Sequence, residues 1–154
     1  MTAETQLAVT GIAADLASAL TYYRERLGWP VSINARDRCL LLRTGDLIDG
    51  LILPAALGQP VAAELCTSMM SGPISTDDDK WRWTFFTECC RRENPELPPD
   101  LRSANVRTVP KGGHVMLPPH PESKLWRQPP EPNRSLPPWS AVVAVARRVL
   151  DRLT

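Results

Sequence analysis

The distribution of proline limits the folds open to this chain more than any other feature of its sequence. Twelve of the sixteen prolines lie between Pro95 and Pro138. Proline donates no backbone hydrogen bond and fixes φ, so this density excludes long helices and favours extended backbone. The sequence therefore predicts a proline-rich irregular segment over 95–138 that contains short strands, with regular structure before and after it.

An amphipathic helix is predicted near each end of the sequence. Over residues 11–27 apolar side chains recur at helical spacing until Gly28 and Pro30 prevent continuation. Residues 139–153 show a second apolar stripe, with Ser140 as a candidate N-cap. A shorter helix is predicted over 60–70, because Pro60 suits a first helical turn. The stripes consist of Ile12, Leu16, Leu20, Tyr23 and Leu27 in the first helix, and of Val142, Val143, Ala146, Val149, Leu150 and Leu153 in the last.

Strands are predicted at 31–33, 38–43, 47–53 and 81–87, with two more short strands around Gly112-Gly113 and a polar turn over 75–80. Runs of strands bracketed by helices are typical of α+β folds rather than of doubly wound parallel sheets. We therefore expect residues 1–154 to form a single α+β domain. Its small, mostly antiparallel sheet would be flanked by an N-terminal and a C-terminal helix.

The composition is that of an ordinary globular protein, with 43% hydrophobic and 23% charged residues. No apolar run approaches the ~18 residues that a membrane-spanning helix needs, and the first residues lack the pattern of a signal peptide. We expect a cytoplasmic location and no membrane partner. Cys39, Cys66, Cys89 and Cys90 show no Cys-x-x-Cys spacing, so free and mostly buried thiols are predicted.

Charge is distributed unevenly along the chain. Residues 1–101 hold nine Lys/Arg against fourteen Asp/Glu, whereas residues 102–154 hold nine against three. This asymmetry fits either internal electrostatic complementarity or a basic face for an acidic partner. Trp126 either packs on proline rings or stacks on bases beside arginines. The candidate partner or nucleic-acid surface consists of Arg107, Trp126, Arg127, Arg134, Arg147 and Arg148.

A glycine turn followed by a histidine forms the candidate ligand motif. In Lys111-Gly112-Gly113-His114, the glycines allow close approach of backbone N–H groups to a phosphate, and His114 begins a strand. We predict these four residues as a nucleotide-binding site. The alternatives are an ordinary hairpin turn and a strand histidine with a structural role.

Two stretches, residues 19–31 and 106–115, together resemble the bifunctional DNA primase/polymerase N-terminal domain of the archaeo-eukaryotic primase superfamily. The first is a helix that ends in Gly28-Trp29-Pro30-Val31, and the second contains the Gly-Gly-His motif. The resemblance implies that His114 contacts nucleotide phosphates, although it follows Gly113 directly, one residue closer than in the family pattern.

The metal-binding part of that family pattern is missing. The family carries an Asp-x-Asp pair at the end of a strand, because two-metal phosphoryl transfer needs several converging oxygen ligands. Here the strand over 81–87 is followed by Glu88-Cys89-Cys90, and Asp77 and Asp79 precede it. We therefore expect a degenerate, non-catalytic relative with no metal or other cofactor.

The predicted function is a binding or regulatory module in replication, repair or transcription. A protein partner is favoured over nucleic acid because the net charge is only +1. The alternative is a minimal metal-dependent nucleotidyltransferase or nucleotide-binding protein. It would use His114 on phosphate, and Glu88 with Asp77 or Asp79 on Mg²⁺ or Mn²⁺. A structural subunit paired through the C-terminal helix is a third hypothesis.

Overall fold

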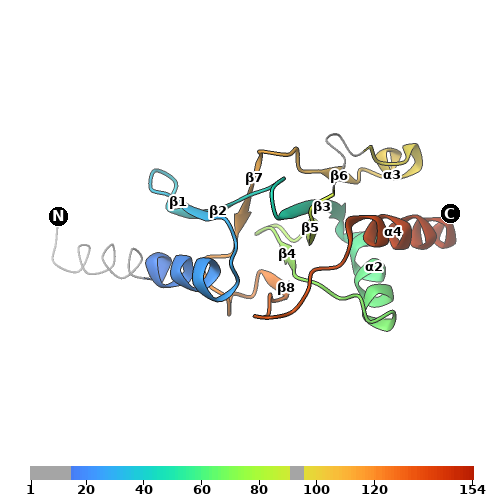
Figure 1. Cartoon of the computed structure of the whole chain (residues 1–154). Helices are drawn as coiled ribbons and strands as arrows, with labels where there is room; N and C mark the ends of the chain where they lie inside the picture. The colour runs from blue at the N-terminus through green and yellow to red at the C-terminus, as the bar shows by residue number, and fades with distance from the viewer. Residues whose placement is uncertain (1–14, 91–95) are drawn as a thin grey trace.

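The computed structural model describes residues 15–90 and 96–154. It confirms the α+β class, with helices at both ends of the molecule and antiparallel strands between them (Figure 1). The strands are β1 (Val31–Asn34), β2 (Cys39–Arg43), β3 (Ile48–Pro54), β4 (Ile74–Thr76), β5 (Arg82–Glu88), β6 (Arg107–Thr108), β7 (His114–Leu117) and β8 (Trp126–Gln128). Residues 15–21 are α-helical and continue into a π-helical turn, η1 (Tyr22–Arg26); the further helices are α2 (Ala55–Thr67), α3 (Pro99–Ser103) and α4 (Trp139–Leu153).

The strands form two antiparallel sheets instead of the one that the sequence predicts. The first has the order β1-β2-β7, and the second has the order β6-β3-β5-β4-β8. The longest pairing joins β3 to β5, from Ile48 opposite Glu88 to Pro54 opposite Arg82. The two strands at the centre of the larger sheet therefore come from either side of α2.

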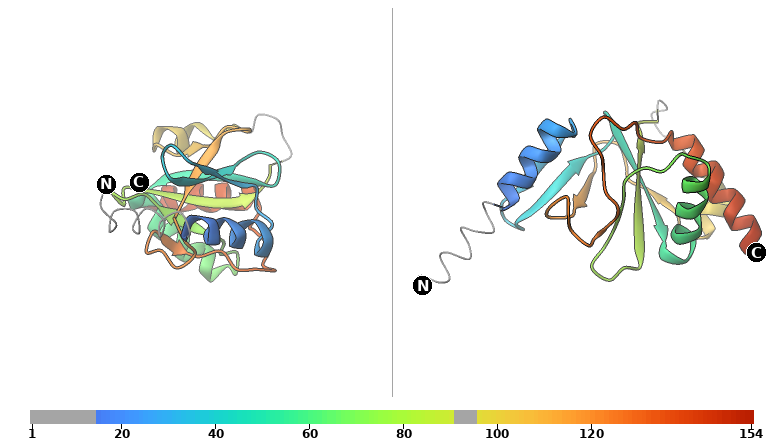
Figure 2. Two further views of the ribbon diagram at one scale, coloured as in Figure 1. Left: turned by 90° about the vertical axis from the view of Figure 1, so that its left-hand side faces the viewer. Right: turned by 90° about the horizontal axis from the view of Figure 1, so that it is seen from below.

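The five-stranded sheet buries side chains on both of its faces. Because successive strand residues point to opposite faces, the neighbours Phe85 and Phe86 enter different hydrophobic clusters. Phe85, with Leu51 and Leu53, packs in the cluster formed with α2 and α4. Figure 2 shows these two helices together on one side of the sheet, with the N-terminal helix at the opposite end.

An aromatic cluster joins the N-terminal helix to the sheets. The rings of Tyr23 and Trp29 stack at 6.0 Å, and Phe86 lies 5.6 Å from both Trp29 and Trp126. The Tyr23 hydroxyl donates to the Pro118 carbonyl at 3.2 Å and accepts a hydrogen bond from Trp126 Nε1 at 3.0 Å. These contacts connect the N-terminal helix and Trp29 to the proline-rich segment.

The longer helices follow the predicted pattern with two differences, and the short helix α3 inside the proline-rich segment is not predicted at all. Helix α4 has the predicted bounds, but Pro138 occupies its N-cap position without a side-chain hydrogen bond, so Ser140 is not the cap. Helix α2 begins at Ala55 and contains Pro60, so the predicted start at that proline is wrong. In the first predicted helix, residues 11–14 lie outside the described residues, as does Pro95 of the proline-rich segment.

Three local predictions also need correction. Ser75 and Thr76 belong to β4 rather than to a turn. The strands on either side of Gly112-Gly113 do not form a hairpin, because β6 pairs with β3 whereas β7 pairs with β2. The four cysteines are free as predicted, but Cys66 is exposed and the other three are half-buried.

Candidate functional site

The glycine turn is held by hydrogen bonds within the chain. Gly112 N–H donates to the Thr44 carbonyl at 2.8 Å, and Gly113 N–H donates to the Pro110 carbonyl at 2.9 Å. The Thr44 hydroxyl also donates to Pro110, at 2.8 Å. The two glycine N–H groups are thus occupied, which argues against their predicted role as phosphate ligands. Gly112 has φ +80°, a conformation that glycine adopts without strain.

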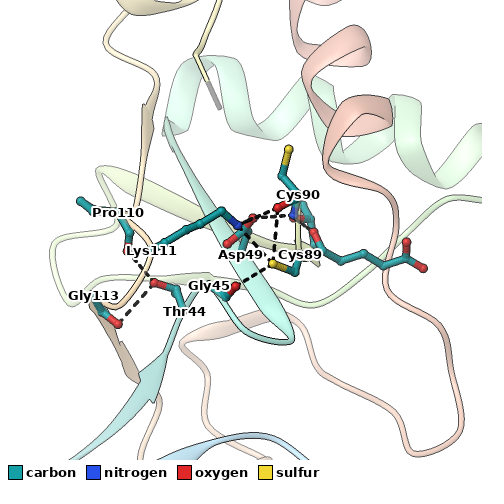
Figure 3. Close-up of polar contacts among 10 residues, drawn as sticks. Thr44, Gly45, Asp49, Cys89, Cys90, Pro110, Lys111 and Gly113 are labelled. Carbon is teal, nitrogen blue, oxygen red and sulfur yellow. Dashed lines mark hydrogen bonds and ion pairs between the residues drawn. The ribbon is translucent and has the colours of Figure 1, made fainter. Parts of the chain in front are cut away.

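Lys111 points into a polar cluster beneath this turn, formed by Asp49, Cys89, Cys90 and Lys111 (Figure 3). Its ammonium donates to the Cys90 carbonyl at 2.7 Å, to Cys89 Sγ at 3.2 Å and to Asp49 Oδ2 at 3.4 Å. Asp49 Oδ2 also accepts from Cys90 N–H at 2.7 Å. The cluster, called the Lys111 cluster below, joins β3, the end of β5 and the turn before β7.

The carboxylate of this cluster is removed from water. Asp49 is 3% exposed, and its Oδ1 has no hydrogen-bond partner among residues 15–90 and 96–154. Burial lowers the pKa of Lys111, but the hydrogen bond to Cys89 and the charge of Asp49 outweigh this effect, so its pKa is raised. The ammonium therefore serves as the internal counter-ion of a buried carboxylate, which argues against the predicted role of Lys111 in phosphate binding.

His114 lies in a different place, on an open groove between β7 and the larger sheet. This β7 groove has a volume of about 450 Å³. Its floor spans three neighbouring strands: Thr84 of β5 pairs with Ile52 of β3 on one side and with Ser75 of β4 on the other. All four residues of β7 line one side, and an acidic loop, Asp77 to Asp79, lies at its rim.

Gly50 allows β7 to approach the sheet closely at one end of this groove. A Cβ at this position would lie 3.2 Å from Val109 Cγ2 and 3.5 Å from Val115 Cγ2. Val109 N–H donates to the Gly50 carbonyl at 3.0 Å. The glycine therefore sets how near the smaller sheet packs against the larger one.

The structure brings together some of the residues of the predicted nucleotidyltransferase but not all of them. His114 and the aspartates of the acidic loop line the same groove. Glu88 is at the opposite end of β5 from Arg82, about 20 Å away at strand spacing. Within residues 15–90 and 96–154, no group of three His, Cys, Asp or Glu side chains is placed to hold a metal ion.

The predicted basic surface is divided by internal pairing. Arg147 contacts Asp100 at 3.2 Å, and Arg148 contacts Glu64 at 3.4 Å. Arg134 pairs with Glu131 in the same loop, at 3.1 Å. Three of the five predicted arginines thus have acidic partners, and two of these pairs, Arg147–Asp100 and Arg148–Glu64, join the basic part of the chain to its acidic part, as internal electrostatic complementarity predicts.

The remaining members of that surface lie in different environments. Arg127 stacks over the ring of Trp83 at 5.0 Å, and Arg107 is exposed on β6. Trp126 is 7% exposed and belongs to the aromatic cluster. The prediction that Trp126 contributes to a contact surface therefore requires correction, because its ring is enclosed by other aromatic side chains.

Sequence reasoning missed Asp49, Ser75 and Thr84 as site residues. Asp49 could have been recognised, because it lies inside an otherwise apolar strand. A carboxylate in such a position is almost never buried without a partner, so its sequence context indicates an ion pair. No such signal marks the two hydroxyl residues, because their position on the groove floor depends on which strands become neighbours.

Comparisons with protein-family models, curated proteins and solved structures give no match for this chain. Among the described residues, none of the helices has both the length and the apolar character required to cross a membrane.

Proposed function

We propose that this chain is a non-catalytic binding module that engages a protein partner through the β7 groove. The observation that carries the proposal is the groove itself, which is open and combines an apolar side with the acidic rim of Asp77 to Asp79. Grooves of this kind bind a ligand against apolar side chains and orient it with a few polar groups.

The charge of the rim favours a protein over a nucleic acid at this place. Three consecutive aspartates repel phosphate groups and attract Lys or Arg side chains. Arg82 also lines the groove, and its single positive charge offsets only one of these three negative charges. We therefore propose a partner segment with basic side chains.

The edge of β7 favours an extended conformation for that segment. β7 is the last strand of its sheet, and within the part of the chain that the structure describes its second edge has no partner strand. Every second residue of an antiparallel edge strand directs its N–H and C=O groups outward, where a peptide can pair with them. Strand addition of this kind supplies affinity through the main chain and specificity through side chains.

The resemblance to primase/polymerase domains suggests the process in which this module acts. If the chain is a degenerate member of that family, the β7 groove around His114 corresponds to its former nucleotide site. We propose that the site has changed from nucleotide to peptide recognition, in a replication, repair or transcription assembly.

Selection from a displayed peptide library on the whole chain tests the proposal. We expect enriched peptides to be extended, apolar and rich in Lys or Arg. Their affinity should fall about tenfold in Asp78→Asn/Asp79→Asn, because two attractive charges are lost. Asp77 is left intact because its carboxylate accepts a hydrogen bond from Trp81 N–H.

The matched control is Asp46→Asn/Asp151→Asn, which removes the same net charge from exposed positions outside the groove. An equal loss of peptide affinity in both variants would show that only the overall charge matters. This result would contradict binding at the groove. A failure to enrich any peptide, together with tight binding of short single-stranded DNA, would instead favour nucleic acid as the partner.

The shared location of His114 and the acidic loop also supports the alternative, a nucleotide-binding protein. Thermal unfolding with nucleoside triphosphate and Mg²⁺ or Mn²⁺ separates the two functions. The proposal expects no rise in Tm. A metal-dependent rise that disappears in His114→Ala would establish the alternative.

A further inference from the structure

The Lys111 cluster places a thiol against an amine, and this contact is not needed by the β7 groove. Lys111 Nζ is 3.2 Å from Cys89 Sγ, while the thiol donates to the Gly45 carbonyl at 2.8 Å. Asp49 Oδ2 is 3.4 Å from the same nitrogen, and the other oxygen of this buried carboxylate is unpartnered within the described residues. A nucleophile, an oxidisable sulfur and a proton acceptor thus meet in one place.

We propose that this cluster is an oxidation site at which hydrogen peroxide couples Cys89 to Lys111 through a covalent S–N bond. Cys89 is half-buried, so a molecule as small as hydrogen peroxide can reach its sulfur. The nitrogen is already near van der Waals distance of the sulfur, so bond formation requires little movement of either side chain.

The reaction has two balanced steps. In the first, the Cys89 sulfur attacks one peroxide oxygen; the O–O bond breaks, sulfenic acid forms and one water leaves. In the second, one ammonium proton of Lys111 first passes to Asp49 Oδ2 and then to solvent, which frees the lone pair of the nitrogen. The neutral amine attacks the sulfur as the S–O bond breaks, and the departing hydroxide takes a second proton from this nitrogen to become water. Peroxide is reduced, the sulfur is oxidised by two electrons, and the chain loses two hydrogens.

The neighbouring cysteine is less well placed to capture the sulfenic acid. Figure 3 shows the Cys90 side chain directed away from Lys111, whereas the Cys89 sulfur faces the ammonium. A disulfide between adjacent cysteines also requires a strained eight-membered ring. The geometry therefore favours the amine as the group that resolves the oxidised sulfur.

The link would fix the turn that precedes β7. Lys111 is three residues before His114, and the new bond would tie this turn to the end of β5. The inference depends on the positions of these side chains and not on the proposed function of the groove, so each can fail without the other.

Peptide mapping of the whole chain after peroxide treatment tests the proposal. We expect an intact mass lower by two hydrogens, loss of tryptic cleavage after Lys111, and a cross-linked peptide containing Cys89. A thiol reductant should restore both the mass and the cleavage, because sulfenamides are reducible. Unchanged cleavage after Lys111 would overturn the inference.

Three variants identify the partners of the bond. The product should persist in Cys90→Ala and be absent from Cys89→Ala. It should also be absent from Lys111→Arg, which keeps the positive charge beside Asp49 but lacks the nucleophilic amine. Loss of the product in Cys90→Ala would show a disulfide instead. Addition of oxygen to Cys89 without cross-linking would show simple over-oxidation; either result contradicts the S–N bond.

Discussion

At the scale of single residues, the Tyr23 hydroxyl shows how burial and hydrogen bonds favour one protonation state of a side chain. It is fully buried, donates to Pro118 and accepts from Trp126. Burial raises its pKa to about 12, although the Trp126 hydrogen bond acts in the opposite direction. The fold therefore stabilises the neutral phenol.

This shift predicts a loss of stability in alkali. In the unfolded chain the phenol ionises near the ordinary tyrosine pKa of 10.0, whereas in the folded chain it ionises near 12. The stabilisation that the fold gains from the neutral Tyr23 hydroxyl is complete below pH 10.0. It is lost as the pH rises through the folded-state pKa of about 12. Tyr23→Phe should remove this pH dependence and cost about 1–3 kcal/mol at neutral pH, because Trp126 N–H loses its acceptor. Chemical denaturation at several pH values measures both effects.

Absorbance of tyrosinate provides an independent check of the same shift. The chain has two tyrosines, and the step near pH 12 should be absent from Tyr23→Phe. A wild-type titration that is complete well below this pH would contradict the burial of the hydroxyl.

The ion pair between Lys111 and Asp49 yields a second prediction. Lys111→Met should destabilise the fold by about 3 kcal/mol, because it leaves a buried carboxylate without its counter-ion. The Lys111 side chain is 25% exposed and that of Asp49 is 5% exposed, so water offsets little of this cost. Since the pKa of Lys111 is raised, the wild-type contribution is complete below the ordinary lysine value of 10.5 and declines as pH rises above it.

Denaturation of a double-mutant cycle measures this coupling. Adding Asp49→Asn to Lys111→Met should recover part of the lost free energy of unfolding, because the uncompensated charge is removed. Additive effects of the two substitutions would show that the pair is not coupled.

At the scale of elements, the proline-rich segment is fixed to the sheet by close packing. Glu88 N–H at the end of β5 donates to the Pro137 carbonyl at 2.9 Å. Gly72, just before β4, lies against the same proline ring. A Cβ on Gly72 would overlap that ring and lie 2.9 Å from its Cγ.

Gly72→Ala should therefore destabilise the chain by about 1–3 kcal/mol through overpacking. The backbone at this position allows alanine, so the cost comes from contact with Pro137 and not from φ. Gly72→Ala/Pro137→Ala should regain stability relative to the single variant. Thermal unfolding tests this expectation, and a double variant no more stable than Gly72→Ala would contradict it.

In helix α2, tertiary packing overrides the local preference of proline for the first helical turn. Proline at position 60 indicates a first turn, yet the helix starts five residues earlier, at Ala55. Pro60 then lies in the second turn, where its missing N–H costs one helical hydrogen bond. Burial of Leu57 and Val61 against the larger sheet compensates for this loss. That compensation depends on the sheet and cannot be read from residues 55–60.

At the scale of the whole molecule, the central sheet couples two hydrophobic clusters. Phe85 and Phe86 are adjacent in sequence, but each belongs to a different cluster on an opposite face. Phe85→Ala and Phe86→Ala should each cost about 3–5 kcal/mol, because each leaves a cavity.

Both substitutions should shift one common unfolding transition, because β5 carries both side chains. Urea denaturation followed by tryptophan fluorescence and by far-ultraviolet circular dichroism measures this cooperativity. Coincident curves support the coupling. Two separate transitions, each affected by one variant, would show that the clusters unfold independently.

Local patterns along the chain specify several of its helices and strands, although not β4 or the start of α2. The periodicity of residues 139–153 determines α4, β-branched and aromatic residues determine β5, and His114 begins β7 as predicted. These features depend on neighbours along the chain, whose spacing the sequence states directly. The α+β class follows from their order.

The residues that meet in the candidate sites are set by tertiary packing. It separated β6 from β7, directed Lys111 inward toward Asp49, and placed the acidic loop across a groove from His114. It also paired Arg147 with Asp100, far away in sequence. Each of these outcomes depends on which distant strands and helices become neighbours. These neighbours are selected because they bury both faces of the central sheet. Such burial involves residues from the whole chain, so no short stretch of sequence predicts it.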